Sequence, residues 1–291
     1  MTETLTLKDG TEIALERSGA GRPIVFIHGW AMRGRCFEQQ QADLQGQFQI
    51  VSFDLRGHGG SKSCASPPTI EQLGADVIEV FEQLDLSDAV CVGWSMGAMV
   101  AWEALSRRDF ASRVAGLVCI DMSPRITNDA SWKLGLADGR RPGAALRAIE
   151  EMRSDWRRMT ERFVPRIFAP ENIDRLQSLI DEISDDTRHL DGAVMADLWE
   201  SMAVQDFRKT LPHMTTPMRA IHGANSQLYP TATGEFIAAE APHAELSIFE
   251  KSGHSPHLEE PERFAAELQN FIQRLEPALN KPRPSLKTAV K

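Results

Sequence analysis

The amino-acid sequence predicts an α/β fold with a mostly parallel central sheet, helices on both faces of that sheet and an inserted helical cap. Three observations predict it. Short continuous apolar runs recur along the chain, as in parallel strands that are buried on both faces. Segments with helical spacing separate most of these runs. The alternation then stops between residues 125 and 211, where several helix-like segments occur and no strand pattern is convincing.

The first two predicted strands are alternating segments at residues 2–8 and 11–17. Asp9-Gly10 lies between them and is a two-residue hairpin signal. The further strands are predicted at residues 24–27, 50–53, 89–92, 114–120, 218–221 and 246–249, and the helices between them at residues 70–84, 96–106, 235–241 and 260–272.

These elements divide the chain into a core in two parts, residues 1–124 and 212–276, and a helical cap at residues 125–211. The cap is rich in tryptophan, methionine and phenylalanine. Packing between cap helices accounts for most of these side chains, and we expect a few to face a pocket beneath the cap. The proline-rich, basic tail at residues 277–291 is predicted to be disordered.

Composition excludes several classes of function. The 291 residues carry 41 acidic and 32 basic side chains, a net charge of −9, which disfavours nucleic-acid binding. No apolar stretch approaches the roughly 20 residues that span a bilayer. The N-terminus reads as a strand rather than a signal peptide, and the four cysteines lack metal-ligand spacing. We therefore expect a cytoplasmic protein without a membrane span, metal or cofactor.

The segment Gly93-Trp94-Ser95-Met96-Gly97 joins a predicted strand to a predicted helix. A turn this tight crowds the neighbouring chain, and glycines at its two ends relieve the crowding and leave the serine hydroxyl projecting above the sheet. Ser95 is therefore the candidate nucleophile. The alternative is a glycine-rich turn with an incidental serine.

A serine hydroxyl needs a base, and His254 is the best candidate among the eight histidines. It follows the last predicted strand, which places it at the same sheet edge as Ser95. His257 competes locally but fits the start of the final helix, and His222 is interpreted as structural. The backbone amides of Trp30 and Met96 are expected to form an oxyanion hole.

These motifs together resemble the α/β-hydrolase superfamily over almost the whole chain outside the cap and tail. The resemblance rests on His28-Gly29-Trp30, on residues 54–61 (DLRGHGGS), on the serine turn and on Gly253-His254. It implies a hydrolase fold with a catalytic triad and specifies no substrate. Asp54 and Arg56 are expected to organise the loop beside the nucleophile.

The triad acid departs from the commonest pattern of that superfamily. The usual position, after the strand at residues 218–221, is Ser226, which carries no charge. The superfamily has a second location after the preceding strand, and here Asp121 occupies it. This combination resembles small bacterial acyl-esterases. Asp121 is therefore the predicted acid, with a helix cap or turn residue as the alternative, because an uncharged partner would hold His254 in the wrong tautomer.

The predicted function is a serine hydrolase that cleaves a small carboxylic ester, lactone or thioester through an acyl-enzyme. The same triad would also serve a carbon–carbon bond hydrolase, a cofactor-free perhydrolase or an acyltransferase. A non-enzymatic ligand-binding protein fits less well, because the nucleophile, base and acid are all intact. The expected partner is a small acyl substrate, and these motifs encode neither its identity nor the oligomeric state.

Overall fold

The computed structural model describes residues 2–61, 67–137 and 144–279. Its centre is an eight-stranded sheet with the order β1-β2-β4-β3-β5-β6-β7-β8. Strands β3 to β8 run parallel to their neighbours, whereas β2 pairs antiparallel with both β1 and β4. The strands are β1 (Thr2–Thr6), β2 (Glu12–Ser18), β3 (Pro23–Ile27), β4 (Gln49–Phe53), β5 (Ala89–Trp94), β6 (Val114–Ile120), β7 (Met218–Gly223) and β8 (Ala244–Phe249). The predicted fold class is confirmed.

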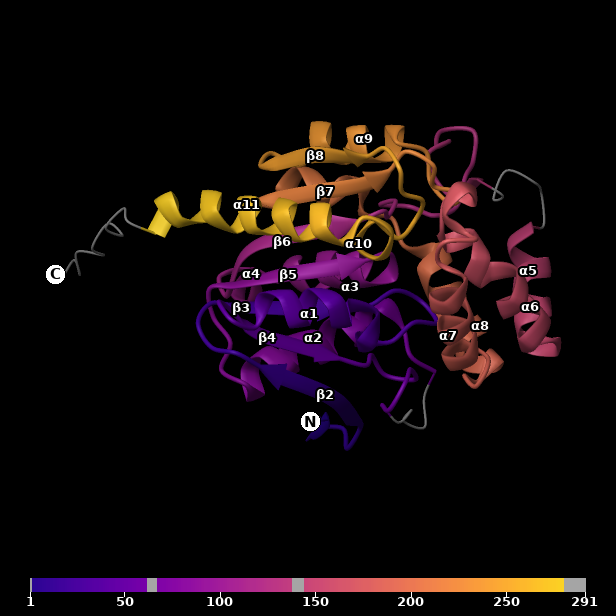
Figure 1. The fold of residues 1–291 in the computed structure, drawn as a ribbon, viewed down its shortest axis with the longest axis horizontal. Helices are drawn as coiled ribbons and strands as arrows, with labels where there is room; N and C mark the ends of the chain where they lie inside the picture. The colour runs from indigo at the N-terminus through magenta and orange to yellow at the C-terminus, as the bar shows by residue number, and fades with distance from the viewer. Residues whose placement is uncertain (1, 62–66, 138–143, 280–291) are drawn as a thin grey trace, which may run out of the picture.

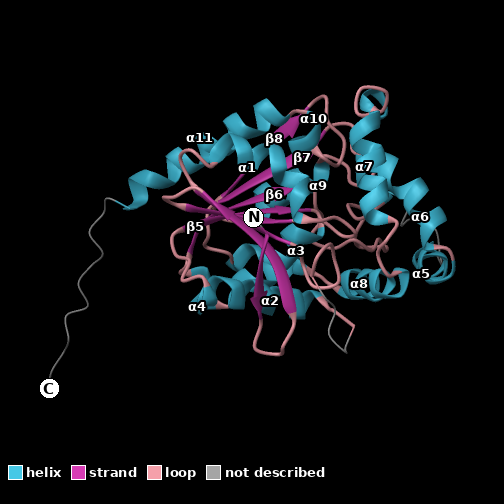
Figure 2. Ribbon diagram, turned by 60° about the horizontal axis from the view of Figure 1, so that its bottom comes forward, coloured by secondary structure: helices cyan, strands magenta, loops and turns pink. Residues whose placement is uncertain are grey.

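Helices cover both faces of this twisted sheet (Figure 2). Helices α1 (Glu38–Leu44) and α11 (Pro261–Leu279) contact each other on one face, and α2 (Ile70–Gln83) and α3 (Met96–Leu105) on the other. Helix α9 (Ala232–Glu240) packs on β7 and β8. Every residue of β3 and β5 is buried, as expected for strands covered on both sides. Three short helices of the described core, α1, α4 (Arg108–Ala111) and α10 (Pro256–Glu259), are additions to the predicted set.

The first hairpin differs from its prediction. Strand pairing ends at Thr6 and Glu12, so five residues form the turn instead of two. Gly10 takes φ +86°, a left-handed conformation that glycine adopts without strain. The Asp9 carboxylate accepts from the Thr11 backbone N–H at 2.9 Å and from the Arg56 guanidinium at 2.7 Å. The reversal is closed by backbone hydrogen bonds from the Gly10 N–H to the Leu7 carbonyl and from the Leu7 N–H to the Thr11 carbonyl, each of 2.8 Å, so Gly10 ends the turn and does not stand at the centre of a two-residue loop.

A helical segment separates β6 from β7 and lies at one end of the sheet (Figure 1). It contains α5 (Ala144–Ser154), α6 (Trp156–Phe163), α7 (Gln177–Thr187), α8 (Gly192–Val204) and several 3₁₀ turns, and between residues 121 and 217 the described residues include no strand. The Trp30 indole, in the loop after β3, donates to the Met195 carbonyl of α8 at 2.9 Å. The segment therefore lies against the carboxyl edge of the strands.

Helix α11 runs two residues beyond Pro277. Residues 277–279, which the sequence assigns to a disordered tail, therefore belong to this helix. The rest of the predicted tail lies outside the described residues. None of the helices in the described ranges has the length and apolar character that a bilayer crossing requires.

Candidate active site

Ser95 lies in the turn between β5 and α3. Its backbone has φ +52° and ψ −121°, a conformation that a residue with a Cβ rarely adopts. The flanking glycines explain how the turn closes: a Cβ on Gly93 would lie 2.6 Å from the Ala98 nitrogen, and one on Gly97 would collide with the Ile27 carbonyl. The predicted strained serine turn is present, and it projects Ser95 at the carboxyl edge of the sheet.

Two backbone N–H groups flank this serine. The loop after β3 packs directly on the turn, because a Cβ on Gly29 would lie 3.3 Å from the Ser95 Cβ. The Met96 amide begins α3, where N–H groups have no intrahelical acceptor. Among the described residues, no acceptor is found for the Trp30 or Met96 amide. Both remain available to an anion beside Ser95.

His254 and Asp121 meet although 133 residues separate them. The His254 Nδ1 lies 2.6 Å from the Asp121 Oδ2, and both side chains are buried. Because the carboxylate can only accept, Nδ1 carries the proton and Nε2 is left as the basic nitrogen. The predicted base and acid are thus in contact, in the tautomer that general-base catalysis requires.

Three further groups lie against the Asp121 carboxylate. The Ser226 hydroxyl donates to Oδ2 at 2.6 Å, the Gly223 N–H donates to Oδ1 at 3.3 Å, and the His222 Nδ1 lies 3.1 Å from Oδ1. Burial opposes ionisation of Asp121, but the neighbouring imidazoles of His222 and His254 outweigh it and hold its pKa well below the usual value. Asp121 is therefore a buried carboxylate that stays charged.

The structure adds contacts for two residues that the sequence places near the site. Ser226 stands at the usual position of the acid without a charge, and its hydroxyl donates to Asp121. His222, which the sequence interprets as structural, is fully buried with its ring against Asp121. The sequence signal for His222 is its position at the end of a predicted strand, whereas the pairing of Ile221 with Ile120, which sets it beside Asp121, is seen only in the structure.

Trp94, the residue before Ser95, contacts the loop that carries His254. The Trp94 indole donates to the His254 carbonyl at 2.9 Å, so the residue before the serine holds the backbone of the histidine. In the described structure the Ser95 hydroxyl makes no hydrogen bond to His254, and it lies 4.0 Å from the Met122 Sδ. Catalytic hydrogen bonds are commonly long before substrate binds.

His28 and His58 order the loops around the site. The His28 Nε2 accepts from the Leu55 N–H at 2.8 Å, and the His58 Nε2 accepts from the Ala31 N–H at 3.1 Å. Asp54 accepts from the Gly34 and Gly60 amides. Burial lowers the pKa of His28 to about 4 and that of His58 to about 3. Both histidines are thus buried neutral rings with loop-ordering contacts.

The lowered pKa values of His28 and His58 predict that the folded protein loses stability in acid. Histidines in the unfolded chain have a pKa of 6.5, so below that pH the unfolded state binds protons that folded His28 excludes until about pH 4. Stability should therefore fall as pH is lowered from 6.5 to 4, by about 3 kcal/mol for His28 alone. Differential scanning calorimetry at constant ionic strength would measure this decrease. A Tm that is unchanged between pH 7 and pH 5 would contradict it.

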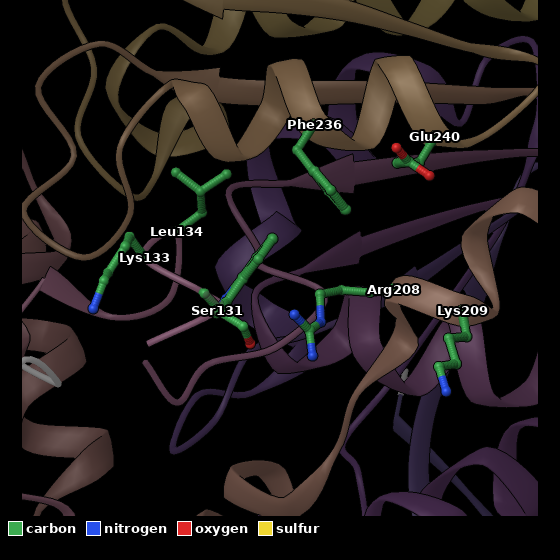
Figure 3. Close-up of a pocket in the computed structure, with 8 residues that line it drawn as sticks. Ser131, Lys133, Leu134, Arg208, Lys209, Phe236 and Glu240 are labelled. Carbon is green, nitrogen blue, oxygen red and sulfur yellow. The ribbon is translucent and has the colours of Figure 1, made fainter. Parts of the chain in front are cut away.

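A separate cavity of about 580 Å³ lies between α9 and the loop at residues 131–134. Phe236 and Glu240 project from α9 toward Ser131 and Arg208 (Figure 3). None of the three predicted triad residues lines this cavity. In the described ranges, no group of three His, Cys, Asp or Glu side chains is arranged to hold a metal ion.

Comparison with known proteins agrees with this geometry. The model of the alpha/beta hydrolase family matches residues 24–267, which is most of the chain. The chain belongs to the alpha/beta hydrolase family. The superfamily resemblance in the sequence is therefore confirmed, and the match spans the elements that carry Ser95, Asp121 and His254.

The chain is similar to proteins named as esterases and as an enol-lactonase. A pimeloyl-[acyl-carrier protein] methyl ester esterase of Vibrio vulnificus is 28% identical over 264 residues, which cover 90% of this chain and 98% of that protein. A 3-oxoadipate enol-lactonase of Acinetobacter baylyi is 25% identical and covers 94% of this chain and 97% of its own length. An esterase structure from Exiguobacterium antarcticum superposes with a TM-score of 0.85 at 27% identity, over 94% of this chain and all of that one.

Proposed function

We propose that this alpha/beta hydrolase cleaves a small carboxylic ester or lactone through an acyl-enzyme intermediate. The observation that carries the proposal is the buried pair of His254 and Asp121, 2.6 Å apart, beside the strained turn that presents Ser95. The named relatives support the same class of reaction, since they include an ester hydrolase and a lactone hydrolase.

In the proposed mechanism the Ser95 hydroxyl attacks the substrate carbonyl while the His254 Nε2 removes its proton. Asp121 stabilises the imidazolium that forms, and the Trp30 and Met96 amides bind the oxyanion. His254 then protonates the leaving alcohol. Water, activated by the same imidazole, releases the acid and restores Ser95.

We further propose that the helical segment caps this site and shapes its acyl pocket. Three aromatic side chains of this segment pack edge-on against the Trp30 indole, with ring centroids 5.0–5.5 Å from that of Trp30: Trp156, Phe163 and Trp199. Because the Trp30 amide is a proposed oxyanion donor, these rings lie next to the reaction centre. Such an apolar wall suits an acyl chain better than a charged group.

The test is hydrolysis of p-nitrophenyl esters of graded acyl length, beside lactones and acyl thioesters, with fluorophosphonate labelling in parallel. We expect turnover of short or medium esters together with labelling. Labelling without any ester, lactone or thioester turnover would refute ester hydrolysis. It would favour one of the other reactions of the same triad, such as carbon–carbon bond hydrolysis.

A further inference from the structure

Glu259 is a buried carboxylate five residues after His254. It ends the short helix α10 (Pro256–Glu259), and only 3% of its surface is exposed. Burying a carboxylate is costly unless hydrogen bonds compensate it. Burial raises the pKa of Glu259, and four hydrogen-bond donors, from Asn172, Ala169, Gly253 and Ser255, oppose the rise.

One carboxylate oxygen holds the loop that carries the base. The Glu259 Oε1 accepts from the Gly253 N–H at 2.7 Å and from the Ser255 N–H at 3.3 Å. These two residues flank His254 in the sequence, so the carboxylate fixes the backbone on both sides of the imidazole. Together with the Trp94 indole on the His254 carbonyl, this leaves the backbone of the base little freedom.

The other oxygen binds the helical segment. The Glu259 Oε2 accepts from the Ala169 N–H and from the Asn172 Nδ2, each at 2.8 Å. The Asn172 Nδ2 also donates to the Lys251 carbonyl at 2.7 Å. The two chains touch here, since a Cβ on Gly253 would lie 2.5 Å from the Ala169 nitrogen. One carboxylate thus joins the loop of the base to the segment that covers the site.

We propose that Glu259 is a positioning residue for the reaction: its carboxylate sets the place of His254 relative to Asp121 and Ser95 and ties it to residues 169–172. The inference rests on the proposed function, in which His254 is the base. Charge-assisted hydrogen bonds suit this role because they are short and strong. Glu259 does not contact the reacting atoms and acts through the backbone of the loop.

The test compares Glu259→Gln with Glu262→Gln, an exposed glutamate of α11. In Glu259→Gln an NH2 group replaces one of the two carboxylate oxygens. On that side of the side chain, N–H groups then face the N–H donors that the oxygen accepted from. We expect kcat to fall by about 10- to 100-fold, because small displacements of a catalytic group cost this much. KM should change less than kcat, the rate of phosphonate labelling should fall with kcat, and Glu262→Gln should match the wild type.

Asn172→Ala is the second variant, and it removes one of the two donors to Oε2 while leaving the carboxylate in place. We expect a smaller loss of kcat, of about three- to tenfold. A folded Glu259→Gln enzyme with wild-type kcat and labelling rate, or with a loss confined to KM, would overturn the proposal. If Glu259→Gln does not fold, an Asn172→Ala enzyme with unchanged kcat would overturn it. Lack of ester turnover by the wild type is a failure of the proposed function instead, and the labelling rates still test Glu259.

Discussion

Replacing Ser95 by alanine should reduce kcat/KM for any ester substrate by at least about 10⁴-fold, while the protein remains folded. The physical reason is that the variant lacks the only protein atom in the proposed mechanism that forms a bond with the acyl group. The measurement is steady-state hydrolysis of the best p-nitrophenyl ester. Ser106→Ala, at the exposed end of α3, is the matched control and should keep wild-type activity. Residual activity of the Ser95 variant above a few per cent would mean that another group is the nucleophile.

Replacing Asp121 by asparagine should have the second largest effect, a fall in kcat of about 10⁴-fold. The asparagine amide has one acceptor oxygen and an NH2 donor in place of two acceptor oxygens. With the NH2 group toward His254, Nδ1 must accept and the proton moves to Nε2, and in either orientation of the amide the charge that stabilises the imidazolium is lost. Ser226→Ala removes one hydrogen bond, of 2.6 Å, from the same carboxylate and should lower kcat by only about tenfold.

The ranking of these two variants tests where the triad acid lies. Ser226 occupies the position after β7 that usually carries the acid, and Asp121 follows β6. Both variants are compared by kcat at the pH optimum of the wild type. A larger loss of kcat in Ser226→Ala than in Asp121→Asn would mean that the residue that orients His254 lies in the loop after β7 and not after β6.

Most of the fold could be predicted because the parallel strands of this sheet are short apolar runs and the first two strands alternate polar and apolar residues. All eight predicted strands are present, and the serine turn, the loop of the base and Asp121 all lie at strand ends. The carboxyl ends of parallel strands share one edge, so their positions in the sequence place Ser95, Asp121 and His254 at that edge. The choice of Asp121 as the acid rests on the superfamily resemblance, and its contact with His254 is seen in the structure. The length of the first hairpin turn differs because Gly10 ends the turn, where its N–H donates to the Leu7 carbonyl, and Asp9-Gly10 is not a two-residue loop by itself.

The neighbours of the acid could not be predicted because they depend on strand register. Trp94 pairs with Ile120, and Ile120 pairs with Ile221. The next residue on each of these three adjacent strands is Ser95, Asp121 or His222, so the three lie in one row across the sheet. The sequence places each at a strand end and does not give the register that aligns them. The role of Glu259 could not be predicted either, because its partners at residues 169–172 lie about 90 residues away in the sequence.

The most direct test of the central claim is to locate the covalent adduct formed by a fluorophosphonate. The claim is that Ser95 is the nucleophile of a triad completed by His254 and Asp121. After reaction with the inhibitor and proteolysis, mass spectrometry should find one phosphonyl group per chain, on the peptide that contains Ser95, in step with the loss of ester hydrolysis. Complete inhibition with the adduct on a different residue, or full labelling of Ser95 with ester hydrolysis unchanged, would contradict the claim.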